Sequence, residues 1–63
     1  MPIIHVNMFE GRTLEQKRKL VSSMTEAVVK SLDIKPEAVR IVLHDLPKQN
    51  FGAGGVLASD KKE

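Results

Sequence analysis

A chain of 63 residues, of which 41% are hydrophobic, can form only one domain, residues 1–63, and a chain this short buries only about 60% of its unfolded surface. The absence of cysteine excludes disulfides and thiolate zinc sites, and two histidines make no convincing metal site, so we expect no metal. A net charge of +2, from ten basic and eight acidic residues, is too small to indicate nucleic-acid binding, and no apolar run approaches the roughly 20 residues that span a membrane.

Residues 3–9 predict a β-strand, because their side chains alternate between two faces. One face holds Ile4, Val6 and Met8, and the other holds Ile3, His5, Asn7 and Phe9. Pro2 is tolerated at the first position of a strand. Residues 10–12 are then expected to turn the chain.

Residues 14–32 predict an amphipathic helix. Thr13 is a good N-cap, and Gln16 three residues later completes a capping-box pattern. The apolar stripe, spaced by three, four and seven, consists of Leu14, Leu20, Val21, Met24, Ala27, Val28 and Leu32. The helix should end within residues 33–37, because Pro36 disfavours helical geometry at Lys35.

Residues 38–45 predict a second strand, rich in β-branched side chains and ended by Leu46-Pro47. A strand, a helix and a strand form a β-α-β unit with parallel strands and a right-handed crossover. Residues 48–58 contain three glycines and predict a turn or small hairpin, and residues 59–63 form a charged tail that is expected to fray. The fold class is α/β (α+β by some schemes), with a C-terminal hairpin.

One helix can cover only one face of this sheet, whereas parallel sheets are normally covered on both faces. The core is also purely aliphatic, since the chain has no Trp, no Tyr and only two Phe. We therefore expect a homo-oligomer that covers the open face with another copy, and a stable monomer is the competing interpretation. No signal-peptide pattern opens the chain, so we expect it in the cytoplasm.

Arg12 immediately precedes the helix N-cap, where the positive end of the helix dipole disfavours a cation. One interpretation is a solvated arginine paired with Glu10 or Glu15. The other is an anion site that combines the guanidinium group with N–H groups of the helix N-terminus. The residues alone leave both open.

Arg40 lies between Val39 and Ile41 in an apolar strand, and arginine is rarely buried without a partner. It either faces outward in alternation with Val42 and His44, or pairs with an acid of a neighbouring chain, or binds a carboxylate at the start of the strand. The sequence does not decide among these three.

Two other features favour ordinary structural roles, and a third, Phe51, stays open. His5 and His44 could titrate near neutral pH, but they lie on alternating strand faces without a nucleophile and are interpreted as polar sheet-face residues. The glycines at 52, 54 and 55 lack the following Lys-Ser/Thr of a phosphate loop and are interpreted as turn formers with positive φ. Phe51 is either an interface anchor or an apolar wall for a ligand.

Pro2 offers a base. Aminopeptidases remove Met1 when the second residue is small, which would leave a secondary amine at the terminus. An α-amino group titrates at about 7.7–8.0 in short peptides. Desolvation and nearby cations such as Arg12 and Arg40 would lower the pKa of the Pro2 amine, and an amine near neutral pH is an effective general base. A proline that merely begins a strand is the alternative.

An ordered set of motifs across nearly the whole chain resembles the 4-oxalocrotonate tautomerase family. Each motif is weak alone, but their order and spacing are specific. After Pro2 they are Phe9-Glu10-Gly11-Arg12-Thr13, Glu15-Gln16-Lys17, Ser31-Leu32-Asp33, Val39-Arg40-Ile41, Phe51-Gly52 with Gly54-Gly55, and Leu57-Ala58-Ser59.

This resemblance implies a hexamer, a trimer of dimers, that isomerises a 2-hydroxymuconate-like dienol or unsaturated 2-keto acid in aromatic-compound breakdown, without a cofactor. It implies that Pro2 is the general base. It implies that Arg40 of a neighbouring subunit binds the 2-keto oxygen and adjacent carboxylate, and that Arg12 binds the far carboxylate. Phe51 would belong to the apolar wall of the site, which Phe9 would narrow or reshape, since the family often has leucine there.

Related dehalogenases have a glutamate near the position of Ala53 to activate water, so the resemblance also implies poor water addition to haloacrylates here. Two other functions stay open. One is a promiscuous tautomerase acting on phenylpyruvate or another substrate. The other is a non-catalytic oligomeric module, which is expected if Met1 is retained and the Pro2 nitrogen is an amide.

Overall fold

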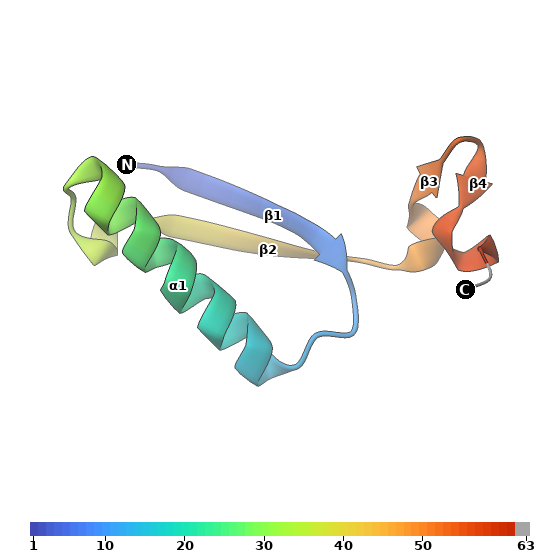
Figure 1. The fold of residues 1–63 in the computed structure, drawn as a ribbon, viewed down its shortest axis with the longest axis horizontal. Coiled ribbons are helices and arrows are strands. Elements are labelled where there is room, and N and C mark those ends of the chain that lie inside the picture. Colours follow the sequence, from blue (N-terminus) through green and yellow to red (C-terminus); the bar gives the residue numbers. More distant parts are fainter. Residues whose placement is uncertain (62–63) are drawn as a thin grey trace.

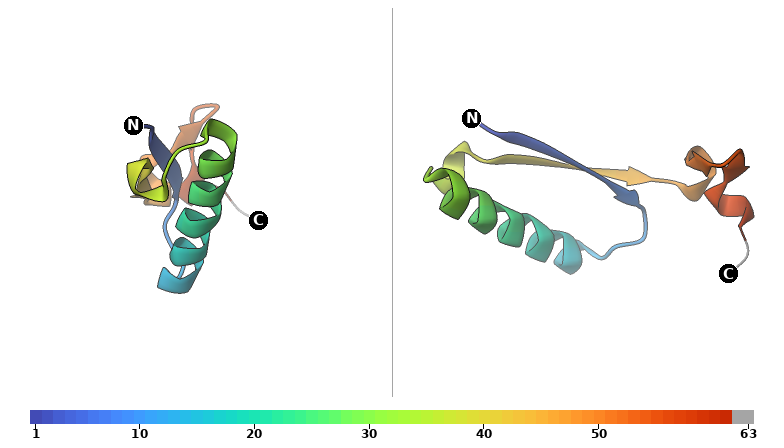
Figure 2. Two further views of the ribbon diagram at one scale, coloured as in Figure 1. Left: turned by 90° about the vertical axis from the view of Figure 1, so that its left-hand side faces the viewer. Right: turned by 45° about the horizontal axis from the view of Figure 1, so that its top comes forward.

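The structure, a computed structural model, describes residues 1–61 and consists of a β-α-β unit followed by a small hairpin (Figure 1). Strands β1 (Ile3–Phe9) and β2 (Arg40–Leu46) are parallel and pair in register from Ile3 with Arg40 to Phe9 with Leu46. Helix α1 (Leu14–Leu32) connects them and lies against one face of the sheet (Figure 2). The predicted fold is confirmed.

Helix α1 begins and ends at the predicted residues. The Thr13 hydroxyl accepts a hydrogen bond from Gln16 N–H at 3.1 Å, and the Gln16 side chain accepts one from Thr13 N–H at 3.0 Å, so the capping box is formed. At the other end Asp33 adopts the left-handed conformation, with φ 55°, and donates its N–H to Val29 O at 2.9 Å. This geometry ends the helix before Pro36 is reached.

Replacing the N-cap residue Thr13 tests how much its side-chain hydrogen bond stabilises this helix. Thr13→Ala leaves the N–H groups of the first turn without their side-chain acceptor, so we expect a loss of about 1 kcal/mol in the free energy of unfolding. Denaturant unfolding at fixed protein concentration measures this loss. Ser22→Ala, at an exposed position inside the helix, is the matched control and is expected to change stability little. Equal losses in both variants would contradict a special role for the cap.

The helix covers the sheet with the middle of its apolar stripe. On the sheet, the half-buried side chains are Ile4, Val6, Met8, Ile41 and Leu43; on the helix they include Leu20, Val21, Met24 and Val28. In a single chain the stripe is only partly covered: Leu14 and Leu32 at its ends are 63% and 56% exposed, and Ala27 is also exposed. A helix of 19 residues is about 28 Å long and a strand of seven residues about 23 Å, so the outer turns extend past the sheet.

The opposite face of the sheet is open. From β1 it presents Ile3, His5, Asn7 and Phe9, and from β2 it presents Arg40, Val42 and His44, all of them exposed. Ile3 is 60% exposed, and no side chain of residues 1–61 is fully buried. The predicted open face is therefore present, and it carries large apolar side chains.

Strand β2 begins two residues later than predicted and ends one residue later. Pro36–Ala38 forms a 3₁₀ turn instead of the start of the strand, with Ala38 N–H on Lys35 O and Val39 N–H on Pro36 O, each at 3.0 Å. Proline favours the first position of such a turn. At the far end Leu46 still pairs with Phe9 and accepts a hydrogen bond from Glu10 N–H at 3.0 Å, and Pro47, which has no N–H, ends the strand.

The predicted hairpin is present, but it occupies only the middle of residues 48–58. Short 3₁₀ turns, Lys48–Asn50 and Ala58–Asp60, flank the antiparallel strands β3 (Gly52–Ala53) and β4 (Val56–Leu57). Gly54 and Gly55 have φ 62° and 81°, as a two-residue turn of type I′ requires. The predicted positive φ is wrong for Gly52, which lies in β3. The expected frayed tail falls partly on residues 62–63, outside the described residues.

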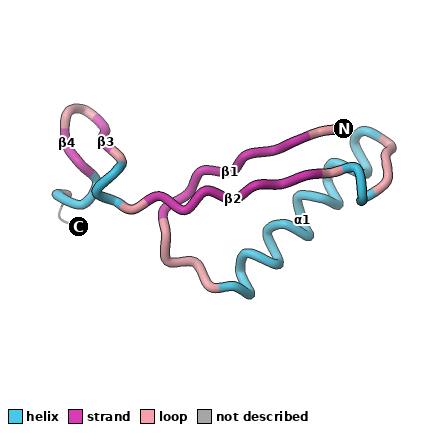
Figure 3. The backbone as a smooth tube through the Cα atoms, turned by 180° about the vertical axis from the view of Figure 1, so that it is seen from behind, coloured by secondary structure: helices cyan, strands magenta, loops and turns pink. Residues whose placement is uncertain are grey.

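A single copy of the chain is elongated. Its radius of gyration is 15.0 Å, whereas a compact domain of this length has about 11 Å. The hairpin causes much of the difference, since it stands beyond the end of the sheet and is joined to β2 by one segment of chain (Figure 3). Within residues 1–61, no helix has the length and apolar character required to cross a membrane.

Candidate active site

Pro2 and Arg40 lie together where both parallel strands begin. Arg40 N–H donates a hydrogen bond to Pro2 O at 3.1 Å, and Ile3 is the register partner of Arg40. Pro2 is half-buried, whereas Met1 is 78% exposed. This end of the sheet therefore holds the candidate base beside the backbone of a candidate cation.

The Arg40 side chain is exposed and alternates with Val42 and His44 on the open face, as one of the three interpretations expected. None of the acids in residues 1–61 forms an ion pair with it. Its guanidinium group is thus free for an anion or for an acid of another chain.

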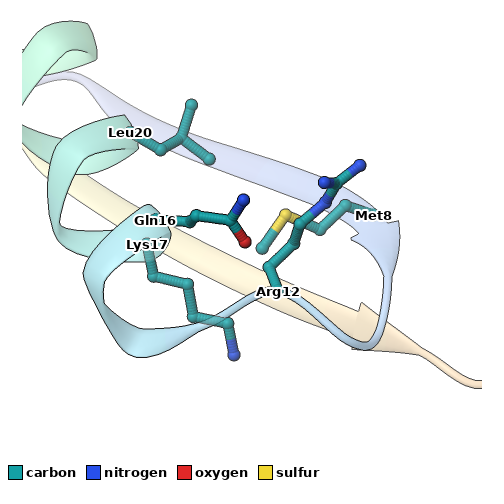
Figure 4. Close-up of a pocket in the computed structure, with 5 residues that line it drawn as sticks. All are labelled: Met8, Arg12, Gln16, Lys17 and Leu20. Atoms are coloured by element: carbon teal, nitrogen blue, oxygen red, sulfur yellow. The ribbon is translucent and has the colours of Figure 1, made fainter.

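Arg12 lies at the opposite end of the sheet, after β1. Gly11 has φ 115°, a conformation that favours glycine, and it turns the chain toward the helix N-cap. The Arg12 side chain lines a hollow of about 160 Å³, together with Met8, Gln16, Lys17 and Leu20. Figure 4 shows the Arg12 guanidinium group beside Met8, with the amine of Lys17 pointing the other way.

The local charges leave Arg12 available. Glu15, one of its two expected partners, pairs instead with Arg18 at 3.1 Å. Lys17 pairs with Asp45 of β2 at 2.5 Å. Arg12 has no ion pair with Glu10 or with any other acid in the described part of the chain, so the predicted pairing is wrong for a single copy. Arg12 is therefore an exposed cation without an ion-pair partner, beside a surface hollow.

The two phenylalanines form an aromatic pair next to Arg12. Their ring centroids are 5.3 Å apart and the rings are nearly perpendicular, at 89°. Together with Asn7, Met8 and Leu46 they line a hollow of about 220 Å³. Phe51 is held there by its carbonyl, which accepts a hydrogen bond from Ala58 N–H at 2.8 Å. The pair provides an apolar wall, although the sequence did not indicate that the two rings touch.

One chain does not bring the five candidate residues together. Pro2 and Arg40 lie at one end of a seven-residue strand, and Arg12, Phe9 and Phe51 lie at the other. At about 3.3 Å per residue, the two groups are roughly 20 Å apart. A small acid cannot span that distance, so a site that uses both groups requires two copies of the chain.

His5 and His44 form a contact that sequence reasoning missed. His5 Nδ1 and His44 Nε2 are 2.8 Å apart, and the rings stack with centroids 5.1 Å apart and planes 15° apart. The register explains it, because His44 pairs with Asn7 and so lies diagonal to His5 on the open face. Within residues 1–61, no group of three or more His, Cys, Asp or Glu side chains could hold a metal ion.

Comparison with known proteins identifies the family. The family model for tautomerase enzymes matches residues 2–61. The 2-hydroxymuconate tautomerase of Pseudomonas sp. (strain CF600) is 46% identical over 59 residues, which are 94% of this chain and 94% of that protein.

Two solved structures have the same fold. A 4-oxalocrotonate tautomerase isozyme from Methylibium petroleiphilum is 48% identical, with a TM-score of 0.88 over 92% of this chain and 91% of that one. A heterohexameric 4-oxalocrotonate tautomerase from Chloroflexus aurantiacus J-10-fl is 26% identical, with a TM-score of 0.90 over 98% of this chain and 100% of that one. The chain therefore belongs to the tautomerase family of isomerases, and within it to the 4-oxalocrotonate tautomerase group that its motifs indicated.

Proposed function

We propose that the chain isomerises 2-hydroxymuconate or a closely similar dienol of an unsaturated 2-keto acid, in the breakdown of aromatic compounds, with the amine of Pro2 as general base. The observation that carries this proposal is the pairing of Pro2 with Arg40 in a member of this family, through the hydrogen bond between Arg40 N–H and Pro2 O. The 46% identity to a 2-hydroxymuconate tautomerase supports the choice of substrate.

The proposed chemistry requires removal of Met1. The free secondary amine of Pro2 then takes the proton from the 2-hydroxyl group of the dienol, or, from the unsaturated 2-keto acid, a proton on the carbon chain next to the keto group. Either removal leaves a dienolate. The same amine, now protonated, returns the proton to the far carbon of the conjugated system. Arg40 stabilises the negative charge on the enolate oxygen, which is usually the largest single contribution in such catalysis.

Arg12 would bind the carboxylate at the far end of the substrate, and this role gives a test. Arg12→Ala is expected to lower kcat/KM at least tenfold for a dicarboxylate such as 2-hydroxymuconate, because a charge-assisted bidentate contact is lost. For a monocarboxylate such as phenylpyruvate the loss should be small. Steady-state kinetics on both substrates measure the difference. Equal losses for both would assign Arg12 a structural role instead.

The proposed active unit is a homo-oligomer, a hexamer built as a trimer of dimers. The accessible surface of one chain is 5152 Å², roughly 1,100 Å² more than a compact protein of this mass exposes. That excess exceeds the area of about 800 Å² that each partner contributes to an ordinary interface. The open face with Ile3 and Val42, and the distance between Pro2 and Arg12, both support assembly.

The Phe9–Phe51 pair favours a second candidate, a tautomerase of phenylpyruvate, whose phenyl ring could stack against the aromatic wall. Intact mass spectrometry followed by ultraviolet assays on 2-hydroxymuconate and phenylpyruvate tests both candidates. Faster turnover of 2-hydroxymuconate by a chain lacking Met1 supports the proposal, and a preference for phenylpyruvate supports the second. A retained Met1 together with no turnover would indicate a non-catalytic oligomeric module.

A further inference from the structure

Lys48 and Arg12 line one hollow of about 320 Å³ at the Arg12 end of the sheet. The other residues of this hollow are Met8, Phe9, Glu10 and Gly11. The two cations come from different segments, since Arg12 follows β1 and Lys48 follows β2. Two positively charged side chains thus converge on the space beside the aromatic wall.

The backbone holds Lys48 at this position. Glu10 N–H donates to Leu46 O at 3.0 Å, which joins the ends of the two strands just before Arg12 and Lys48. Pro47, with φ −63°, then begins a 3₁₀ turn that is closed by a hydrogen bond from Asn50 N–H to Pro47 O at 2.8 Å. Lys48 is the first residue of that turn, so its position relative to the hollow is set by ordered backbone.

The charges around this hollow do not balance. Three cations, Lys17, Arg18 and Lys30, have carboxylate partners within 4.0 Å. In the part of the chain that the structure describes, Arg12 and Lys48 have none, and Glu10, the one acid lining the hollow, pairs with neither. Two like charges in one concave space repel each other, and an anion bound between them relieves that repulsion.

We propose that Lys48 is a specificity-determining residue that shares the substrate's far carboxylate with Arg12 and so selects dicarboxylates over monocarboxylates. This inference rests on the proposed function. Arg12 supplies a planar fork that orients the carboxylate, and Lys48, from a different segment of the chain, adds a point charge on a flexible side chain. Phe9, which packs against Phe51, lines the same hollow and gives it an apolar side.

The test replaces the amine by an uncharged group of similar length, Lys48→Gln. We expect kcat/KM for 2-hydroxymuconate to fall about three- to tenfold, mainly through a higher KM, because one charge contact in a half-open site is lost. For 2-hydroxypenta-2,4-dienoate, which lacks the far carboxylate, the change should stay below about twofold. Lys48→Arg should restore most of the activity on the dicarboxylate.

Lys19→Gln is the matched control, since Lys19 is an exposed lysine of α1 that lines none of the three hollows described here. It removes the same charge and is expected to leave the ratio of the two kcat/KM values unchanged. Equal effects of Lys48→Gln and Lys19→Gln, or equal losses on both substrates, would overturn the assignment of Lys48.

Equilibrium binding separates this proposal from the proposed function. Calorimetry with adipate and hexanoate as probes requires no turnover. Lys48→Gln is expected to weaken adipate binding about three- to tenfold and to leave hexanoate binding unchanged. Adipate that binds the wild type and Lys48→Gln equally, or that does not bind the wild type at all, would refute the role of Lys48, whatever the enzyme assays give. An inactive wild type that still shows the adipate difference would refute only the proposed function.

Discussion

A residue retained in front of Pro2 is expected to lower kcat/KM by at least about 10²-fold, the scale on which a general base contributes. An amide nitrogen delocalises its lone pair into the carbonyl group and cannot accept the proton that the reaction moves. The comparison is between mature protein and a form with an N-terminal extension ending in Met1-Pro2, with intact mass verifying both. The assay is the ultraviolet change of 2-hydroxymuconate.

Pro2→Ala tests the same role of the terminal amine, with a partial loss of turnover as the expected result. Its processed terminus is still an amine, but a primary one, so we expect turnover to fall by about 10²-fold rather than to vanish. Pro36→Ala, in the turn before β2, removes an internal proline without changing the terminal amine and serves as the control. Full turnover by the N-terminally extended protein would exclude Pro2 as the base.

Arg40→Ala is expected to lower kcat about 10²- to 10³-fold and to raise KM as well. The reason is loss of the cation that stabilises the enolate oxygen. The backbone N–H that bonds to Pro2 O remains in this variant, so the strand pairing and the position of Pro2 should be preserved. Arg18→Ala, which removes a surface arginine paired with Glu15, is the control and should keep normal kinetics. A fall in kcat no larger than that of Arg18→Ala would contradict the role of Arg40.

Mixed oligomers show which chain supplies each group. If a site takes Pro2 from one copy and Arg12 from another, Pro2→Ala and Arg12→Ala chains refolded together should form about a quarter of their sites intact, whereas each variant alone keeps only its residual activity. Recovery of activity on 2-hydroxymuconate measures this fraction. The same experiment with Pro2→Ala and Arg40→Ala recovers activity only if Arg40 acts on the Pro2 of a different copy. No recovery in either mixture would mean that each site is built from one chain.

The parts of the fold that local chemistry specifies could be predicted. Thr13 and Gln16 mark the start of α1 because they satisfy N–H groups within the same helical turn. The alternation in β1 predicts which side chains face the helix, and Gly54-Gly55 predicts a tight turn because both residues need positive φ. Arg12 and Arg40 attracted notice because neither is favourable for the local structure, and both lie without an ion pair among residues 1–61.

The features that depend on register could not be predicted. The contacts between His5 and His44 and between Phe9 and Phe51 join segments about 40 residues apart. The first depends on which residues of β1 and β2 stand opposite each other, and the second also depends on the turn that the chain makes after β2. A pattern with a period of two determines the face of each side chain but not its partner across the sheet. The exposure of Leu14 and Leu32 likewise depends on the relative lengths of helix and sheet.

The absence of any fully buried side chain in residues 1–61 links folding to the amount of protein present. For a chain that completes its core only by association, the unfolded monomer competes with an assembled native state, and mass action favours that state as concentration rises. In the proposed assembly, dilution alone therefore unfolds the protein, and its midpoint of thermal unfolding climbs with each increase in concentration. In that assembly, a newly made copy of the chain gains its stability from the copies already present.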